Sequence, residues 1–351
     1  GGPYPPFTWK IESIVGHNHQ KAAYCGIHYY DSDAYPEQYR GKLYMGNIHG
    51  GCINVDRIER DGSTYKGFGE DDFLTANDAW FMPVAQKTGP DGCLYIADWY
   101  NKIISHNEVP RTHPDRDKSR GRIWRIRHRD QPRVTPPDLT KLDDHALVAQ
   151  LGAPNALVSR LAWLELTDRR ATAVAPDLEK LAADRTATSD RRLAALWALE
   201  SLSPIPTPLL LSLAADAAPT LRHEAARLAA AHPRPESEFL SIATPLLADP
   251  SPSVRAALGD ALRRVPRASA RVMSLAAQLG AASLPAVVAP ANPWPRYERE
   301  FERYLARWAM ELNPASTSAL LASPEGRALP LENRILATLA LGGKDAAIGL
   351  A

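Results

Sequence analysis

Gly89-Pro90-Asp91-Gly92 separates two short runs, Phe81-Met82-Pro83-Val84 and Leu94-Tyr95-Ile96-Ala97-Asp98, and this stretch decides how the first part of the chain folds. Proline followed by aspartate and glycine is typical of a tight turn, because proline presets one backbone angle and glycine tolerates a positive φ. The flanking runs are apolar, and the second is rich in residues that favour strands. The stretch therefore predicts two strands joined by a tight turn.

Similar runs recur on both sides of this stretch. Each is short, contains β-branched or aromatic residues, and is bounded by Gly, Pro, Asn or Asp, as strands are. No long pattern with the 3.6-residue helical period competes with them. Strands are predicted at 9–14, 42–48, 52–58, 93–98 and 122–126.

Composition divides the chain near residue 130. Residues 1–130 hold 14 of the 21 glycines, 10 of the 12 tyrosines and all three cysteines, whereas the remainder is rich in Ala, Leu, Arg and Pro. We expect a β domain over 1–130, a Pro-rich linker over 131–145 and α-helical repeats over 146–351. The fold class is thus multidomain, β followed by α.

The overall numbers exclude several classes of protein. Hydrophobic residues make up 45% of the 351 residues, enough for a core, so the chain is not predicted to be disordered. A net charge of +1 disfavours a dedicated nucleic-acid binder, which needs excess cations to neutralise phosphates. The sequence contains neither an apolar run of ~18 residues that would span a membrane nor a signal peptide at its start.

A helical motif repeats in the second part. Each copy has a turn marked by Pro or Asp, an arginine, and a helix rich in Ala and Leu. Arg160, Arg192, Arg222 and Arg255 occupy equivalent places, 32, 30 and 33 residues apart. Two helices in each repeat resemble a short HEAT-like array, with its clearest copy at 249–255. We expect each arginine to bond to a carbonyl or an aspartate of a preceding turn.

Residues 81–101 and 35–48 resemble the blade repeats of NHL-type and quinoprotein sugar-dehydrogenase-type β-propellers. A blade takes roughly 40–45 residues and a ring about four to eight blades, so the first 130 residues supply only about three. We therefore expect the C-terminal part of a propeller, with further blades upstream, followed by a HEAT-like α-solenoid. The alternative is a small independent β domain.

Several segments together resemble one family, the membrane-bound dehydrogenase-like proteins of planctomycetes and verrucomicrobia. They are 47–62, 72–81, 89–100 and 121–126. The resemblance implies an exported, periplasmic oxidoreductase that acts on sugars or alcohols, uses pyrroloquinoline quinone and calcium, and passes electrons to a cytochrome c domain or protein. The alternative is a non-enzymatic scaffold that binds a protein or a polysaccharide.

The sequence departs from this family in its cysteines. Cys25, Cys52 and Cys93 lie far apart and form no Cys-x-x-Cys-His motif, so this chain attaches no covalent haem. In the related sugar dehydrogenases the catalytic base lies in upstream blades, so the catalytic residue here is unknown.

Four histidines are candidates for a ligand or cofactor site. His17 and His19 are two residues apart, a spacing that points both side chains the same way from an extended strand, toward a metal or a quinone. His28 lies where a similar blade segment meets the central cavity. His49 ends a predicted strand before two glycines that would let a ligand approach the backbone. For His17 and His19, a polar loop on the propeller face is the alternative.

Two further groups complete the candidates. Asn101, His106 and Arg111 belong to a long polar loop whose arginines suit an anionic quinone or sugar acid, unless the loop is only solvated. Asp71, Asp72 and Asp78 offer oxygen ligands for calcium, with turn and cap chemistry as the alternative.

Overall fold

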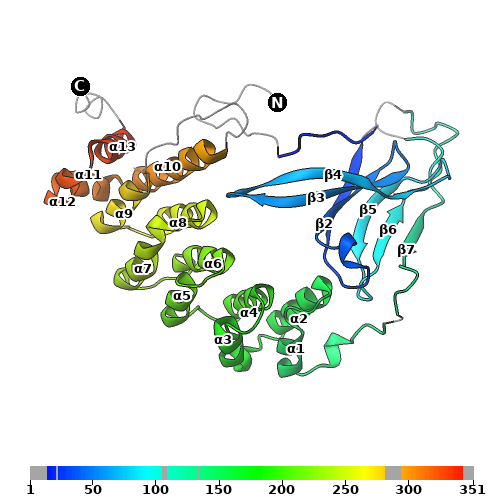
Figure 1. Ribbon diagram of the computed structural model, residues 1–351, viewed down its shortest axis with the longest axis horizontal. Coiled ribbons are helices and arrows are strands. Elements are labelled where there is room, and N and C mark those ends of the chain that lie inside the picture. The colour runs from blue at the N-terminus through cyan, green and yellow to red at the C-terminus, as the bar shows by residue number, and fades with distance from the viewer. Residues whose placement is uncertain (1–13, 21–22, 105–108, 133, 281–293, 343–351) are drawn as a thin grey trace. The chain divides into compact units, whose positions relative to one another are not determined.

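The computed structural model describes residues 14–20, 23–104, 109–132, 134–280 and 294–342, without the side chains of 294–296. Two compact units form, one ending at Arg169 and the other beginning at Arg170 (the turn at 61–64 is grouped with the second). The first holds the strands and the helices α1 and α2, and the second holds the later helices (Figure 1). In the described residues, no helix combines the length and the apolar character that crossing a bilayer requires.

The first sheet is an antiparallel meander in the order β1-β2-β3-β4. Its strands are β1 (Tyr24–Tyr30), β2 (Lys42–Asn47), β3 (Cys52–Asp61) and β4 (Thr64–Thr75). Tyr44 pairs with Val55 and Gly46 with Ile53, so these residues share one face, while Asp56 and Asn54 point to the other. The two predicted strands at 42–48 and 52–58 are confirmed.

The second sheet is a three-stranded meander, β5-β6-β7. Its strands are β5 (Pro83–Thr88), β6 (Leu94–Asp98) and β7 (Arg122–Ile126). The predicted turn forms between β5 and β6: the Gly92 N–H donates to the Gly89 carbonyl at 2.9 Å, and Gly92 adopts φ +78°. The strands predicted at 93–98 and 122–126 are confirmed, whereas 9–14 lies almost entirely outside the described residues.

The two sheets pack around a tyrosine-rich core. Its buried members come from both sheets: Tyr30, Tyr35, Tyr44, Ile53, Val55, Phe81, Leu94 and Ile96. Gly26 and Gly46 allow the close approach, since a Cβ on them would lie 2.4 Å from the Ala85 Cα and 2.3 Å from the Pro83 carbonyl oxygen. The Tyr35 hydroxyl accepts from the Leu94 N–H at 2.7 Å and donates to the Ile126 carbonyl at 2.6 Å, which fixes it to the second sheet.

The first unit continues into α1 (Asp144–Gln150) and α2 (Ala156–Asp168), after a short turn of 3₁₀ helix at Leu139–Lys141. Asn155 caps α2 by accepting from the Leu157 N–H, and its side chain also donates to the Gly89 and Pro90 carbonyls. The β5–β6 turn and the start of α2 are therefore joined by one side chain, which fixes the start of α2 to the β part of the unit.

The second unit is helical, as predicted. The helices are α3 (Ala175–Ala183), α4 (Ser189–Leu202), α5 (Thr207–Ala214), α6 (Pro219–Ala229), α7 (Glu236–Ala243), α8 (Pro252–Arg264), α9 (Ala270–Gly280), α10 (Trp294–Leu312), α11 (Pro314–Ala322), α12 (Pro324–Ala328) and α13 (Leu331–Leu341). Short 3₁₀ turns at Thr172–Val174 and Thr244–Ala248 precede α3 and α8. Helices pack in pairs, α3 with α4 and α5 with α6, and α6, α8 and α10 follow one another in a row.

The predicted arginines form a ladder through these repeats. Arg192 donates to the Ala182 carbonyl and pairs with Asp216 at 2.8 Å. Arg222 donates to the carbonyl of Asp216 in the turn before it and binds both carboxylate oxygens of Asp249 in the turn after α7 and its 3₁₀ extension. Each arginine thus joins a preceding carbonyl, as expected, to an aspartate that comes later in the chain.

The ladder changes at its ends. Arg255 donates to the Asp249 carbonyl at 2.6 Å but pairs with Glu302 of α10 instead of a turn aspartate. Arg160, assigned to the same series by its spacing, is exposed in α2. The full pattern of a preceding carbonyl and a later aspartate therefore holds for Arg192 and Arg222, and Arg255 keeps only the carbonyl.

Replacing Arg192 by leucine should destabilise the helical unit by about 3–5 kcal/mol, because the buried Asp216 carboxylate loses its cation. Arg160→Leu, at an exposed site, is the matched control and should change stability little. Urea unfolding followed by far-UV circular dichroism measures both. Equal losses in the two variants would contradict a structural role for the ladder.

Candidate functional site

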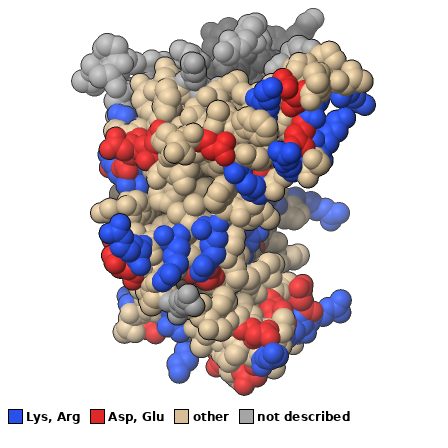
Figure 2. Space-filling view, turned by 90° about the vertical axis from the view of Figure 1, so that its right-hand side faces the viewer, with Lys and Arg blue, Asp and Glu red and all other residues tan. Residues whose placement is uncertain are grey.

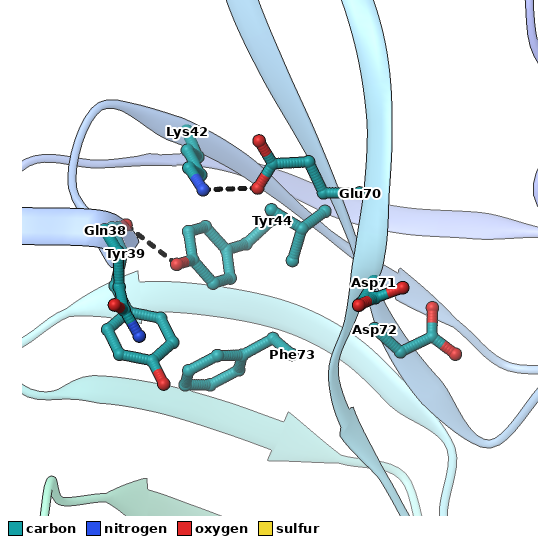
Figure 3. A pocket seen from close by; sticks show the side chains of 9 residues that line it. Gln38, Tyr39, Lys42, Tyr44, Glu70, Asp71, Asp72 and Phe73 are labelled. Atoms are coloured by element: carbon teal, nitrogen blue, oxygen red, sulfur yellow. Dashed lines mark hydrogen bonds and ion pairs between the residues drawn. The ribbon is translucent and has the colours of Figure 1, made fainter.

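A pocket of about 570 Å³ opens in the first unit, where a turn of 3₁₀ helix (Glu37–Tyr39) meets the start of β2 and the end of β4 (Figure 3). This volume falls within the range of small-molecule sites. Its lining combines aromatic, acidic and amide side chains: Gln38, Tyr39, Lys42, Tyr44, Val55, Glu70, Asp71, Asp72 and Phe73.

Three aromatic rings form the apolar side of the pocket. Phe73 packs edge-on against both Tyr39, at 5.8 Å between ring centroids, and Tyr44, at 5.1 Å. The buried Tyr44 hydroxyl donates to the Tyr39 carbonyl at 2.8 Å, and burial raises the pKa of Tyr44, so the group remains a phenol. Tyr39 and Phe73 are half-buried and therefore partly available to a ligand.

Charged groups form the other side. Lys42 pairs with Glu70 across the pocket wall, and Arg57 also approaches Glu70 at 3.4 Å. Gln38 and Asp71 are exposed at the rim. With Glu70, Asp71 and Asp72 beside a single lysine, the lining carries a net negative charge, which disfavours anionic ligands.

A polar network covers the opposite face of the first sheet. The Asn54 amide donates to Asp72 at 2.6 Å, Gln20 donates to the other Asp72 oxygen at 2.9 Å, and Asn47 donates to Asn54 at 2.9 Å. Asn47 and Asn54 are fully buried. Buried amides need such partners, so this network fixes the segment that carries Gln20 onto the sheet.

The structure places the four predicted histidines in three settings. His17 and His19 lie together against Asp56 of β3. His28 accepts from the Thr88 N–H at 3.1 Å and contacts the Thr88 hydroxyl at 2.8 Å, so it joins β1 to β5. His49 is exposed beside Gly50 and Gly51.

The structure describes two of the three loop candidates, Asn101 and Arg111. Asn101 is buried and holds the loop closed through both backbone groups of Asp117, at 2.7 and 3.3 Å. Arg111 is exposed, and its carbonyl accepts from Lys118. His106 lies outside the described residues. The Asn101 side chain therefore stabilises the conformation of the loop.

Of the three aspartates proposed for calcium, Asp71 and Asp72 line the pocket and Asp78 lies elsewhere. Asp71 is exposed, Asp72 accepts from Asn54 and Gln20, and Asp78 pairs with Arg122 at 3.1 Å. Within the described residues they form no common ligand cluster.

Asp98 ends β6 as a hydrogen-bond acceptor. It binds the Met82 and Tyr100 N–H groups and the side chains of Arg122 and Trp124. Burial alone would raise the pKa of Asp98, but these donors outweigh it and hold the pKa below its usual range. With these four donors bound, the Asp98 carboxylate stabilises the backbone and side chains at the end of β6.

Acidic partners also pair with two arginines of β7. Arg122 pairs with Asp98, and Arg125 with Asp91 at 2.6 Å. On the face shown in Figure 2, acidic and basic side chains are interspersed among uncharged ones. The visible surface thus carries both signs of charge.

Sequence patterns did not identify the pocket or Asp56. Tyr39 and Phe73 come from segments 34 residues apart, and Asp56 lies in a strand predicted for its apolar residues. The one available signal was the period-two alternation Cys52, Asn54, Asp56, which places three polar or small residues on one face of β3.

The comparisons with known proteins reach the β part only. Residues 4–130 match the family model of a domain of unknown function, DUF7133. No curated protein and no solved structure matches the chain significantly.

We expect His28 to make stability pH-dependent. Burial, aided by the charge of Lys87, lowers the pKa of His28 below 6.5, so the unfolded chain binds its proton first as the pH falls. The stability that neutral His28 contributes is complete above about pH 6.5 and is lost as the pH falls toward the folded-state pKa.

The stability advantage of the wild type over His28→Gln should therefore shrink between pH 7.5 and 5, as measured by urea unfolding. His49→Gln is the exposed control and should show no such trend. An NMR titration in which His28 protonates at or above pH 6.5 would refute this assignment.

Proposed function

We propose that the β unit binds a neutral or amino sugar in the pocket of Figure 3. The observation that carries this proposal is the lining itself, with partly exposed aromatic rings on one side and carboxylate and amide groups on the other. Aliphatic C–H groups of a sugar pack on aromatic faces, while its hydroxyls bond to carboxylates and amides. The negative lining disfavours uronic acids and phosphorylated sugars.

We place this pocket within a larger exported oxidoreductase of quinoprotein sugar-dehydrogenase type. In this proposal the two meanders are neighbouring propeller blades, the helices are a HEAT-like solenoid, and electrons pass to a haem partner. Two consecutive antiparallel meanders and the arginine ladder support the assignment of the folds. A non-enzymatic scaffold that binds polysaccharide would use the same pocket.

The described residues do not assemble the cofactor site that the resemblance implies. Among the described residues the aspartates suggested for calcium form no ligand cluster, and Arg122, which would suit a quinone carboxylate, is engaged by Asp78 and Asp98. Oxidation would thus depend on groups elsewhere in the protein, and no step is assigned to residues of this pocket. Dye reduction by the full-length protein with calcium and pyrroloquinoline quinone separates the oxidoreductase from the scaffold.

Tyr39→Ala should weaken sugar binding about tenfold, because it removes a partly exposed aromatic ring from the pocket. Asp71→Asn should also weaken it, whereas Tyr65→Ala, an exposed tyrosine outside the pocket, should not. A panel of neutral, amino and acidic sugars is measured by calorimetry. Binding of none of them, or equal binding by the Tyr39 and Tyr65 variants, would reject the pocket as the site.

A further inference from the structure

His17, His19 and Asp56 bring three metal-ligating atoms together on the polar face of the first sheet. The Nε2 atoms of His17 and His19 lie 3.0 and 2.7 Å from the same Asp56 oxygen, and all three ligand atoms lie within 4.8 Å of one another. Neighbouring ligands around a tetrahedral zinc ion lie roughly 3.3 Å apart, given bonds of about 2.0–2.1 Å. Small shifts of the rings would admit an ion.

The backbone around this triad is built to hold the histidines. Gly67 and Gly69 of β4 are two residues apart and so share one face of the strand. A Cβ on Gly69 would lie 2.7 Å from the His17 ring, and one on Gly67 would lie 3.1 Å from Val15. Glycines weaken a strand interior, so their presence at both positions fits a segment that must lie directly on the sheet.

Hydrogen bonds fix the same segment at both ends. The Gly67 N–H donates to the Ile14 carbonyl at 2.8 Å, before the histidines. Gln20, directly after them, donates to Asp72, and its carbonyl accepts from Asn47 at 3.1 Å. The rings of His17 and His19 meet edge to face at 5.1 Å. This support restricts the orientation of both imidazoles, as the surroundings of metal ligands do.

The burial of the triad suits a bound ion. Asp56 is buried, with 7% of its side chain exposed, while His19 is 10% and His17 is 26% exposed. The carboxylate thus lies at the floor and His17 at the solvent side. In the absence of an ion, the Nε2–H groups of both imidazoles donate to one Asp56 oxygen. A divalent cation would replace these two hydrogen bonds with three metal–ligand bonds, one to each side chain.

We propose that His17, His19 and Asp56 bind a divalent first-row transition metal, with open positions toward solvent. Two imidazoles and one carboxylate are the ligand set of zinc and iron(II) sites that keep positions for water or substrate. Calcium prefers oxygen ligands alone, so this site differs in class from the calcium site expected from the resemblance. It also uses none of the pocket side chains proposed for sugar.

The test is metal binding by the whole chain after removal of bound ions with a chelator. Cobalt(II) serves as the spectroscopic probe and zinc(II) as the calorimetric one. We expect one equivalent of each to bind, and we expect a hundredfold excess of calcium not to displace cobalt. The absence of stoichiometric binding, or displacement by calcium, would overturn the proposal.

Variants locate the ion. Asp56→Asn and His19→Ala should each weaken binding by roughly 100-fold, and Gly69→Ala by about tenfold because the added Cβ displaces the His17 ring. His49→Ala, an exposed histidine of the same unit, should bind as the wild type does. If a buried variant fails to fold by circular dichroism, His17→Gln at the solvent side replaces it. Wild-type affinity in folded triad variants would disprove the assignment.

The Tyr39→Ala variant distinguishes this proposal from the sugar-binding one. It should retain metal binding in full while losing sugar affinity, because Tyr39 lines the pocket and supplies no ligand to the triad. Failure of one proposal therefore leaves the other unaffected.

Discussion

The close packing of β1 and β2 against β5 is the constraint on which the first unit depends. Gly26 and Gly46 remove the side chains that would collide with the β5 backbone, and the tyrosine core fills the space beside them. Tyr35 stacks on Tyr30 at 4.8 Å and bonds to backbone groups of β6 and β7, so one aromatic side chain serves both sheets. A core of this kind combines apolar burial with satisfied hydroxyls.

The period of two in β3 then determines where chemistry is possible. Ile53 and Val55 enter the core, and Val55 also borders the pocket at the edge of that core. Asn54 and Asp56 point the other way, to the polar network and the histidines. One strand therefore contributes to two sites on opposite faces. A shift of one residue in its register would destroy both, because every side chain would change face.

In the helical unit, the stabilising polar groups are instead arginines that recur along the chain. The Arg222–Asp249 pair is bidentate, and the same arginine also binds two turn carbonyls. These hydrogen bonds satisfy backbone carbonyls near helix ends that would otherwise be buried without partners. Alanine-rich helices leave little side chain to fix their spacing, so the ladder provides specificity between repeats.

Sequence alone determined the local features of this protein. The strands around 42–48, 52–58, 93–98 and 122–126 and the turn at 89–92 follow from patterns within a few residues of one another. The arginine repeat follows from a short motif that recurs at spacings of 32, 30 and 33 residues. β1 and β4 were not predicted as strands because glycines interrupt them. Gly26 of β1 lies against β5, and Gly67 and Gly69 of β4 lie against the segment before β1. Only the tertiary structure decided that His17 and His19 meet Asp56 and that Tyr39 meets Phe73, because side chains far apart in the chain are brought together by packing and by register, which no local pattern encodes.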